Sequence, residues 1–180
     1  MTEELETLLE MAARLEEAGI GYMVSGSMAM NYYAEPRMTR DIDIVVDMRA
    51  GDAERMLGLL EASYFVDLDM AKEAVRSRRI FNVIHRERLL KIDFVVRKEC
   101  PYREEEFRRR RSVELEGKKI WLVSPEDLLL SKLCWAKDSH SELQLRDVRN
   151  LLAAVPLDEV YVKRWAAELG VQALLAEVRT

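Results

Sequence analysis

Residues 24–46 read Val24-Ser-Gly-Ser-Met-Ala-Met-Asn-Tyr-Tyr-Ala-Glu-Pro-Arg-Met-Thr-Arg-Asp-Ile-Asp-Ile-Val-Val46, and the architecture expected of the whole chain follows from them. The segment opens with a Gly-Ser turn before a short predicted helix. Gly26 lets the backbone approach a ligand closely, and the free amides at a helix N-terminus attract anions. The pair Gly26-Ser27 is therefore suited to holding a phosphate.

The same segment ends with two aspartates at the start of a predicted strand. Asp41 and Asp43 are two residues apart, so their side chains share one face of the strand, with Cβ atoms about 6 to 7 Å apart. Ile42, Ile44 and Val46 point to the opposite face and anchor the strand in a core. Because carboxylates bind hard cations such as Mg²⁺, a phosphate turn followed by this pair indicates nucleotide chemistry.

A third aspartate strengthens this interpretation. Asp93 lies in the apolar segment Lys91-Ile-Asp-Phe-Val-Val96, whose Ile92 and Phe94 are predicted to be buried. Three carboxylates on two strands are what two Mg²⁺ ions about 3.5 to 4 Å apart require. The alternative is a residue at a strand edge that pairs with Lys91. An Asp-x-Asp pair alone is weak evidence, since it also occurs in phosphatases, glycosyltransferases and exposed edge strands.

Hydrophobic periodicity and turn residues predict the remaining elements. Strands are expected over residues 22–25, 42–46, 65–66, 79–85, 89–96 and 119–123, with 79–85 and 89–96 forming a hairpin. Helices are expected over residues 3–18, 28–34, 52–62 with Asp52 as N-cap, 124–136 with Ser124 as N-cap, 143–153 and 158–169, and in a short tail. The predicted class is α/β (α+β), a mixed sheet flanked by helices. Residues 1–123 form its α/β core, and residues 124–180 form a helical region packed on that core as one globular unit.

Composition limits the other possibilities. At 180 residues and 49% apolar, the chain can bury one core. It lacks an apolar run of about 20 residues and a basic, apolar N-terminal leader, so we expect a cytoplasmic protein without membrane contact. Cys100 and Cys134 are isolated, which predicts neither zinc nor a disulfide. The net charge is −5, yet residues 76–119 hold 15 Lys and Arg against 8 Asp and Glu. This local +7 indicates either an anionic partner or solvated faces.

The order of these motifs resembles a known superfamily. Gly26-Ser27, thirteen residues, Asp41-Ile-Asp43 and a distant Asp93 are similar to the nucleotidyltransferases typified by DNA polymerase beta. The chain most resembles the minimal bacterial nucleotidyltransferases grouped with the AbiEii toxins of type IV toxin–antitoxin systems. Further similar blocks bring the coverage to about three quarters of the chain: Phe81-Asn-Val-Ile-His85, Ser124-Pro-Glu-Asp-Leu-Leu-Leu-Ser-Lys-Leu133 and Gln144-Leu-Arg-Asp-Val148.

The resemblance implies the nucleotidyltransferase fold and a metal-dependent enzyme that moves a nucleoside monophosphate from an NTP, such as ATP, to an acceptor hydroxyl. It assigns the β- and γ-phosphates of the NTP to Gly26 and Ser27. It assigns magnesium, as two ions, to Asp41, Asp43 and Asp93. Asp93 would also help to deprotonate the attacking hydroxyl.

Two further site residues follow from the resemblance, Lys132 in the helix after Ser124 and Asp147 in the Arg-Asp block. Lys132 could direct its ammonium at the triphosphate, which would stabilise charge in the transition state. It could equally be an exposed helix lysine. Asp147 could orient Lys132 or an acceptor, or could pair only with Arg146 or Arg149.

The acceptor stays open at this point. Relatives on this scaffold modify RNA ends, protein hydroxyls, and aminoglycoside or lincosamide antibiotics. The AbiEii likeness favours a toxin-like enzyme with an RNA acceptor such as the tRNA 3′ end, or a protein acceptor, and with a cognate antitoxin. Antibiotic modification is the second hypothesis, and a non-catalytic nucleotide-binding partner protein is the third.

Several arginines are candidates for binding anions. Arg37 and Arg40 lie in the loop just before the two aspartates and are predicted to contact the nucleotide. Arg108-Arg-Arg-Arg111 could hold RNA phosphates. Because Glu104-Glu-Glu106 precedes that run, ion pairs along one helix are the competing interpretation.

Overall fold

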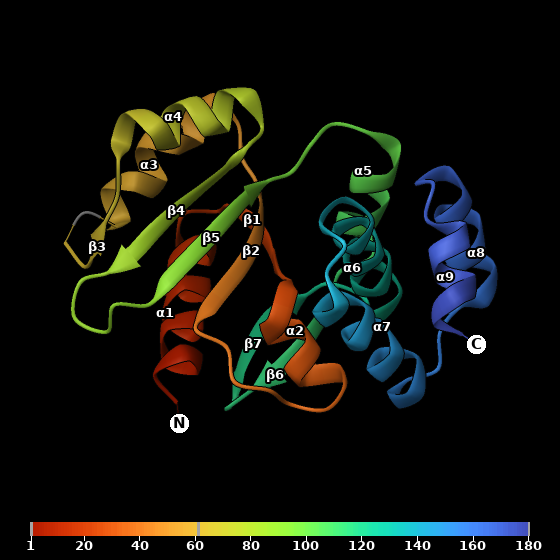
Figure 1. Cartoon of the computed structure of the whole chain (residues 1–180). Helices are drawn as coiled ribbons and strands as arrows, with labels where there is room; N and C mark the ends of the chain where they lie inside the picture. The colour runs from red at the N-terminus through yellow and green to blue at the C-terminus, as the bar shows by residue number, and fades with distance from the viewer. Residues whose placement is uncertain (1, 61, 180) are drawn as a thin grey trace.

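A mixed sheet forms the centre of the structure, a computed structural model that describes residues 2–60 and 62–179 (Figure 1). Within the described residues it has seven strands in the order β3-β4-β5-β2-β1-β7-β6. The strands are β1 (Gly21–Val24), β2 (Asp41–Asp47), β3 (Tyr64–Phe65), β4 (Ile80–His85), β5 (Lys91–Val96), β6 (Arg111–Leu115) and β7 (Lys118–Leu122). The pairs β1–β7 and β2–β5 are parallel and the others are antiparallel. The predicted mixed α/β sheet is confirmed.

Side-chain alternation divides this sheet into a buried and a more open face. Ile42, Ile44 and Val46 on β2 are fully buried, as are Ile92 and Phe94 on β5. On β4 the exposed positions alternate with buried ones in the same way. The predicted hairpin is confirmed, because β4 pairs antiparallel with β5.

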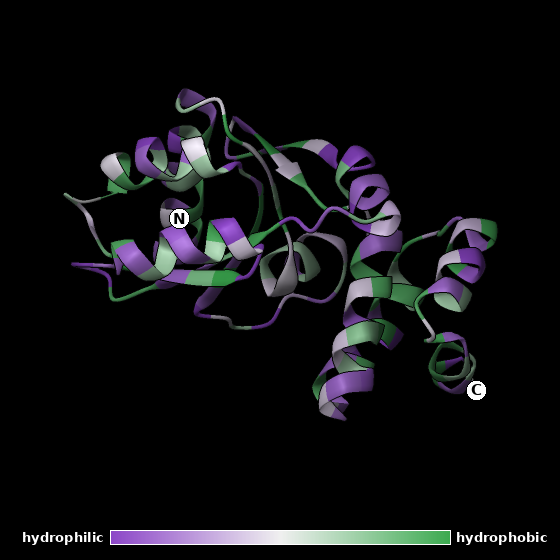
Figure 2. Cartoon of the chain, turned by 90° about the horizontal axis from the view of Figure 1, so that it is seen from above, coloured by the Kyte–Doolittle hydropathy of each residue, from purple (hydrophilic) through white to green (hydrophobic). Residues whose placement is uncertain are grey.

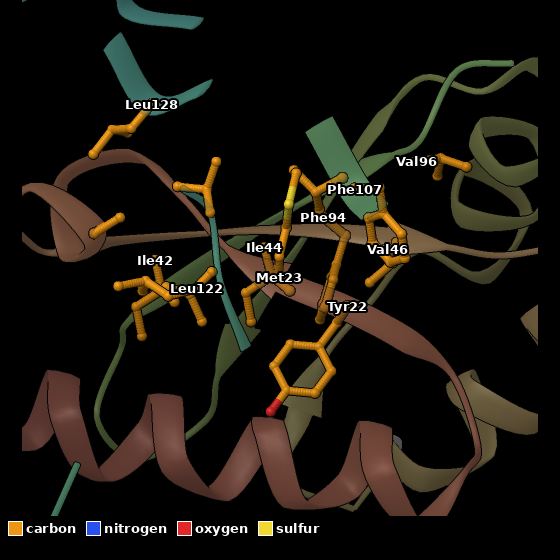
Figure 3. Packing of buried hydrophobic residues seen from close by; sticks show 14 of the residues in the cluster. Tyr22, Met23, Ile42, Ile44, Val46, Phe94, Val96, Phe107, Leu122 and Leu128 are labelled. Carbon is orange, nitrogen blue, oxygen red and sulfur yellow. The ribbon is translucent and has the colours of Figure 1, made fainter. Parts of the chain in front are cut away.

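Helix α1 (Glu3–Glu17) packs behind the sheet, where the apolar stripe predicted from its periodicity is buried. Figure 3 shows Tyr22 of β1 with its hydroxyl directed toward this helix. That hydroxyl donates to the Glu16 carboxylate at 3.4 Å. Helices α3 (Ala50–Leu60) and α4 (Leu68–Ser77) lie together beyond β4 (Figure 1).

The C-terminal third is helical, as predicted. It contains α6 (Pro125–Ser139), α7 (Glu142–Ala154), α8 (Glu159–Glu168) and α9 (Gln172–Val178). Polar and apolar residues alternate along these helices in Figure 2, typical of amphipathic helices packed on one side. Helix α2 (Gly26–Tyr33) contacts both α6 and α7, so the helical third adjoins the strand edge that carries the phosphate turn.

Helix caps were predicted with mixed success. Ser124 caps α6 through a 3.1 Å bond from the Asp127 amide to its hydroxyl, as expected. Asp52 is not the N-cap predicted for the helix over 52–62, because α3 already begins at Ala50. The Asp52 carboxylate instead accepts the Arg49 amide at 2.9 Å, reaching back from the first turn. The described part of this helix ends at Leu60, and residue 61 lies outside the described residues.

Three elements were not predicted: α4, α5 (Pro101–Arg108) and β6. The Asp67 cap that starts α4, accepting the Met70 amide at 3.0 Å, was a readable signal. Strand β6 pairs with β7 through a two-residue turn in which Glu116 and Gly117 both have positive φ, 50° and 72°. Such a turn usually begins with Asn, Asp or Gly, so the Glu116-Gly117 pair did not indicate a hairpin in the sequence.

None of the helices in residues 2–60 and 62–179 is long and apolar enough to span a membrane. The division of the chain at residue 123 stays a prediction.

Candidate active site

The Gly26-Ser27 turn packs against β2, the strand that carries Asp41 and Asp43. The Ser25 amide donates to the Asp43 carbonyl at 2.9 Å, which brings the end of β1 onto β2. Gly26 has φ +58°, and a Cβ built on it would lie 1.9 Å from Asp43 Oδ2. Glycine is required here for two reasons, the left-handed backbone and the closeness of Asp43. The turn that starts α2 and the Asp43 carboxylate therefore form one unit.

The three predicted aspartates meet on the open face of the sheet. In the parallel pair β2–β5, Asp43 is directly opposite Asp93 and Asp41 is directly opposite Lys91. On the other side of Asp93, Asn82 of β4 lies opposite it, so Asp43, Asp93 and Asn82 form one row across three strands. The Asp41 side chain is 61% exposed and that of Asp93 only 20%. The carboxylate row is thus open to solvent at its Asp41 end.

Clustering has an electrostatic cost at Asp43. Burial raises the pKa of its carboxyl, and the negative charges of Asp93 and Asp41 raise it further. The Lys91 ammonium offsets part of this, since its Nζ lies 2.8 Å from Asp93 Oδ2 and 3.6 Å from Asp41 Oδ1. Its hydrogen bond to Asp93 raises the pKa of Lys91. The carboxylates therefore already hold a cation, supplied by the strand that carries Asp93.

The predicted Lys132–Asp147 pair exists and is buried. Lys132 Nζ donates to Asp147 Oδ2 at 2.7 Å and to Gln144 Oε1 at 3.2 Å. Lys132 is 4% exposed and Asp147 1%. Burial opposes ionisation of Asp147, but the Lys132 ammonium and the guanidinium of Arg37 outweigh it and lower the pKa of this carboxyl. Two alternatives are therefore excluded. Lys132 is not an exposed helix lysine, and Asp147 does not pair only with Arg146 or Arg149, because it pairs with Lys132 and Arg37.

Arg37 links this pair to the phosphate turn. Its Nη2 donates to Ser27 Oγ at 2.6 Å and to Asp147 Oδ2 at 3.3 Å. Asn31 holds the Arg37 backbone from α2 with two bonds, accepting its amide at 2.9 Å and donating to its carbonyl at 2.8 Å. Arg37 Nε is buried without a hydrogen-bond partner among the described residues. A chain of contacts thus runs from Ser27 through Arg37 and Asp147 to Lys132.

Arg40 is the one predicted site residue that these contacts leave out. It is exposed, and no hydrogen bond or ion pair joins it to another residue in the described part of the chain. Sequence reasoning in turn treated Lys91 only as an ion-pair partner and overlooked Asn31. The i, i+2 spacing of Lys91 and Asp93 on one strand was the available signal for the former.

The basic run at residues 108–111 is paired internally. Arg108 bonds Glu105 one turn back on α5, with Nη2 to Oε1 at 2.6 Å. Arg109 reaches the buried Glu126 at 3.2 Å, and Arg111 reaches the same carboxylate at 3.4 Å. Arg110 stacks on Phe107 and Trp121. The local positive charge therefore mainly stabilises α5 and α6, which favours the competing interpretation of this run.

The donor set at the aspartate row fits a divalent cation. It consists of hard carboxylate oxygens that attract an ammonium in this structure, and it adjoins a glycine cradle that any Cβ would fill. Among the described residues, however, no three His, Cys, Asp or Glu side chains surround a common point at metal-binding distance. The metal set Asp41, Asp43 and Asp93 stays a prediction.

Comparison with known proteins gives an independent view of the chain. Residues 1–168 match the model of a family described as nucleotidyltransferase of unknown function (DUF6036). No match is found among curated proteins.

Three solved structures share the fold at low identity. An antigenic nucleotidyltransferase-like protein from Paracoccidioides brasiliensis has a TM-score of 0.70 at 19% identity, covering 99% of this chain and 89% of its own. The antibiotic-resistance factor ANT(2'')-Ia has a TM-score of 0.60 at 16% identity, covering 98% of both chains. The lincosamide antibiotic adenylyltransferase LnuA has a TM-score of 0.56 at 18% identity, covering 86% and 98%. The fold is therefore that of nucleotidyltransferases. Specific closeness to the AbiEii toxins has no support among these matches.

Proposed function

The chain belongs to this family of nucleotidyltransferases, and from that premise we propose that it transfers a nucleoside monophosphate from an NTP to an acceptor hydroxyl and releases pyrophosphate. One observation carries the proposal: Asp43 packs against Gly26 so closely that the aspartate row and the phosphate turn adjoin. A triphosphate seated on the turn would place its α-phosphate beside the carboxylates.

The phosphate side of the site consists of amides and cations. The β- and γ-phosphates would be held by the amides of Gly26 and Ser27, by Arg37 and by Lys132. The buried Arg37 Nε without a partner supports this, since an anion would satisfy it. Asp147 positions both cations, because it accepts hydrogen bonds from each. Its role is positioning, and it needs no contact with the nucleotide. Arg40 would contact the nucleotide only after its exposed side chain turns inward.

The carboxylate side would hold divalent metal. Asp41, Asp43 and Asp93 supply the oxygen ligands that Mg²⁺ prefers, and we propose two ions. Bound magnesium would neutralise charge on the triphosphate and on the departing pyrophosphate.

The chemical step is an in-line displacement at the α-phosphorus. The acceptor oxygen forms the new P–O bond while the bond to the pyrophosphate oxygen breaks, and an Asp93 carboxylate oxygen receives the hydroxyl proton. Because Ser27, Arg37 and Lys132 would hold the leaving group on one side, the acceptor must approach from the opposite side. That side is the open face of β5, β4 and β3.

The open face has a distinctive composition. The register places Phe65, Ile84, Lys91 and Asp41 in one row across four strands. Phe65 is 51% exposed and Ile84 38%. The guanidinium of Arg86 stacks on Phe65, 4.1 Å from the ring centroid. The exposed positions of β3 and β4 carry no acidic side chain, so the carboxylates that a polycation such as an aminoglycoside could meet lie at the other end of this face, at Asp93 and Asp41.

We favour a macromolecular acceptor, either RNA such as the tRNA 3′ end or a protein hydroxyl, in a toxin-like enzyme with a cognate antitoxin. Support comes from the solvent-open Asp41 side chain and from the exposed Phe65 with Arg86 stacked on it, a pair against which a base could stack. Antibiotic modification is the second candidate, since two of the fold neighbours are antibiotic-modifying proteins by their titles.

Transfer of label tests these proposals. The protein is incubated with Mg²⁺ and each α-labelled NTP, in separate arms with total RNA, cell protein, lincosamides or aminoglycosides. Label in RNA or protein supports the toxin-like function, and label in an antibiotic alone supports the second candidate. Asp43→Asn should abolish transfer, whereas the exposed control Asp138→Asn should not. NTP binding without transfer to any acceptor would favour a nucleotide-binding partner protein.

A further inference from the structure

Lys91 lies where the carboxylates meet. Its own strand places it two residues before Asp93, and the β2–β5 register places it opposite Asp41. The ammonium is 2.8 Å from an oxygen of the first and 3.6 Å from an oxygen of the second. The side chain is 41% exposed and therefore free to move toward solvent. The Lys91 ammonium is therefore a cation held at the carboxylates by its own side chain, and it can move from them into solvent.

The neighbouring groups explain why a cation is favourable there. Asp43 is opposite Asp93 across the same two strands, so three carboxylates crowd one face. Burial and the two neighbouring negative charges disfavour ionisation of Asp43, and the Lys91 charge acts against this. Without Lys91, the three ionised side chains would repel one another in the protein without metal.

An ammonium and a divalent ion compete for these oxygens. Magnesium requires oxygen ligands at about 2.0 to 2.1 Å, and the nearest carboxylate oxygens are those of Asp93, which Lys91 contacts at 2.8 Å, and of Asp41, which lies 3.6 Å from the same ammonium. Two cations at such short range also repel each other. A free ion must therefore displace Lys91 into solvent, whereas a metal–NTP complex also brings phosphate oxygens with which the displaced ammonium can pair.

Resting on the proposed function, we propose that Lys91 is a positioning residue, an internal counter-ion that holds Asp93 and Asp41 so that the divalent ion enters together with the NTP and not before it. Lys91 lowers the affinity of the protein for the free ion. This antagonism becomes small once a triphosphate is bound, since the ammonium then pairs with phosphate.

Binding of Mn²⁺ tests this without any measurement of turnover. Free Mn²⁺ is followed by electron paramagnetic resonance during titration of the full chain, with and without a non-hydrolysable NTP analogue. Lys91→Met and Lys91→Gln should bind Mn²⁺ alone at least about tenfold more tightly than wild type, because one nearby positive charge is removed. Lys91→Arg should resemble wild type. With the analogue, the gain in Lys91→Met should shrink to less than about threefold.

Lys118→Met is the matched control, since it removes the same charge from an exposed position on β7. It should leave the affinity for Mn²⁺ unchanged both with and without the NTP analogue, which would show that the effect at Lys91 is local and does not come from the net charge of the protein. Thermal unfolding gives a second readout: Lys91→Met should melt lower than wild type in chelator and gain more from Mn²⁺.

Equal or weaker Mn²⁺ binding by both Lys91→Met and Lys91→Gln would overturn the role of Lys91 while leaving the proposed function intact. Absence of Mn²⁺ binding in every variant, even with the analogue, would instead refute the metal-dependent function and this inference with it.

Discussion

Gly26→Ala tests whether the turn needs glycine because Asp43 is so close, in addition to needing it for a left-handed backbone. The added Cβ would lie 1.9 Å from Asp43 Oδ2, 2.6 Å from its Cγ and 2.9 Å from its Cβ. Rotation of the Asp43 side chain would relieve the contacts with Oδ2 and Cγ, but the contact with Asp43 Cβ also requires the turn to move. Since φ is +58°, alanine also carries a left-handed strain of about 1 to 2 kcal/mol. Forcing Asp43 from its rotamer adds about 0.5 to 1.5 kcal/mol.

Gly19→Ala is the matched control for this variant. Gly19 has φ +66°, yet a Cβ on it would meet nothing within 4 Å. It should therefore show the backbone strain alone. In urea titrations we expect Gly26→Ala to lose about 1.5 to 3.5 kcal/mol of the free energy of unfolding and Gly19→Ala about 1 to 2 kcal/mol.

Activity should diverge much further than stability. A displacement of about 1 Å in a reacting group can cost about 100-fold in rate. Pyrophosphate release should accordingly fall at least about 100-fold in Gly26→Ala and stay near wild type in Gly19→Ala. If the two variants lose equal stability and both retain activity, Asp43 does not depend on the glycine, and the joint phosphate and carboxylate site is refuted.

Three further predictions follow from the charged groups. Asp41→Asn and Asp43→Asn should each lower pyrophosphate release at least about 100-fold, while chelator-treated Asp43→Asn should unfold at higher urea than wild type because a crowded charge is gone; wild-type turnover would exclude the metal role. The pKa of Asp147 in the folded protein lies below its ordinary value of 3.8, so the stability that this carboxylate contributes is present above pH 3.8 and lost as the pH falls through the lowered pKa. The free energy of unfolding of Asp147→Asn should therefore fall less steeply in acid than that of wild type, and an unchanged dependence on pH would contradict the buried pair. Arg109→Glu should lose about 3 to 5 kcal/mol, because it removes one of the two arginines that pair with the buried Glu126 and puts a negative charge in its place, whereas the exposed Arg108→Glu should lose much less; equal losses in urea unfolding would refute the internal pairing.

The aspartate row illustrates what residue spacing can predict. A period of two places Asp41 and Asp43 on one face whatever else the chain does, and Asp93 follows the same rule on its own strand. Their meeting depends on the β2–β5 register, which pairs residues 50 positions apart. No local pattern encodes that pairing. The resemblance to a known superfamily supplied it.

The cationic side of the site was less predictable for a related reason. Lys132 and Asp147 are 15 residues apart on separate helices, and Arg37 is 110 residues from Asp147. Arg37 and Arg40 were indistinguishable in sequence because both lie in the irregular segment before β2. What selects Arg37 is the pair of hydrogen bonds between the Asn31 side chain and the Arg37 backbone, one donated by each residue.

The arginine run was hard to interpret for the opposite reason, since a local rule was only partly right. Helical spacing correctly predicts the Arg108–Glu105 pair at i, i+3. Arg109 and Arg111 instead pair with Glu126, which follows a complete β-hairpin in sequence. A charge count along the chain cannot distinguish a surface for RNA from an internal ion-pair network.

The position of Asp147 determines which carboxylate holds the Lys132 ammonium. The positive charge of Lys132 favours ionisation of the Asp43 carboxyl, so these two groups attract each other. It is Asp147 that binds the Lys132 ammonium, at 2.7 Å, and the same carboxylate oxygen binds Arg37 at 3.3 Å. Both cations stay beside the phosphate turn, and Asp43 stays available on the strand. Under the proposed function, a triphosphate would interact with cations whose desolvation and orientation are completed during folding, the condition under which electrostatic stabilisation of a transition state is most effective.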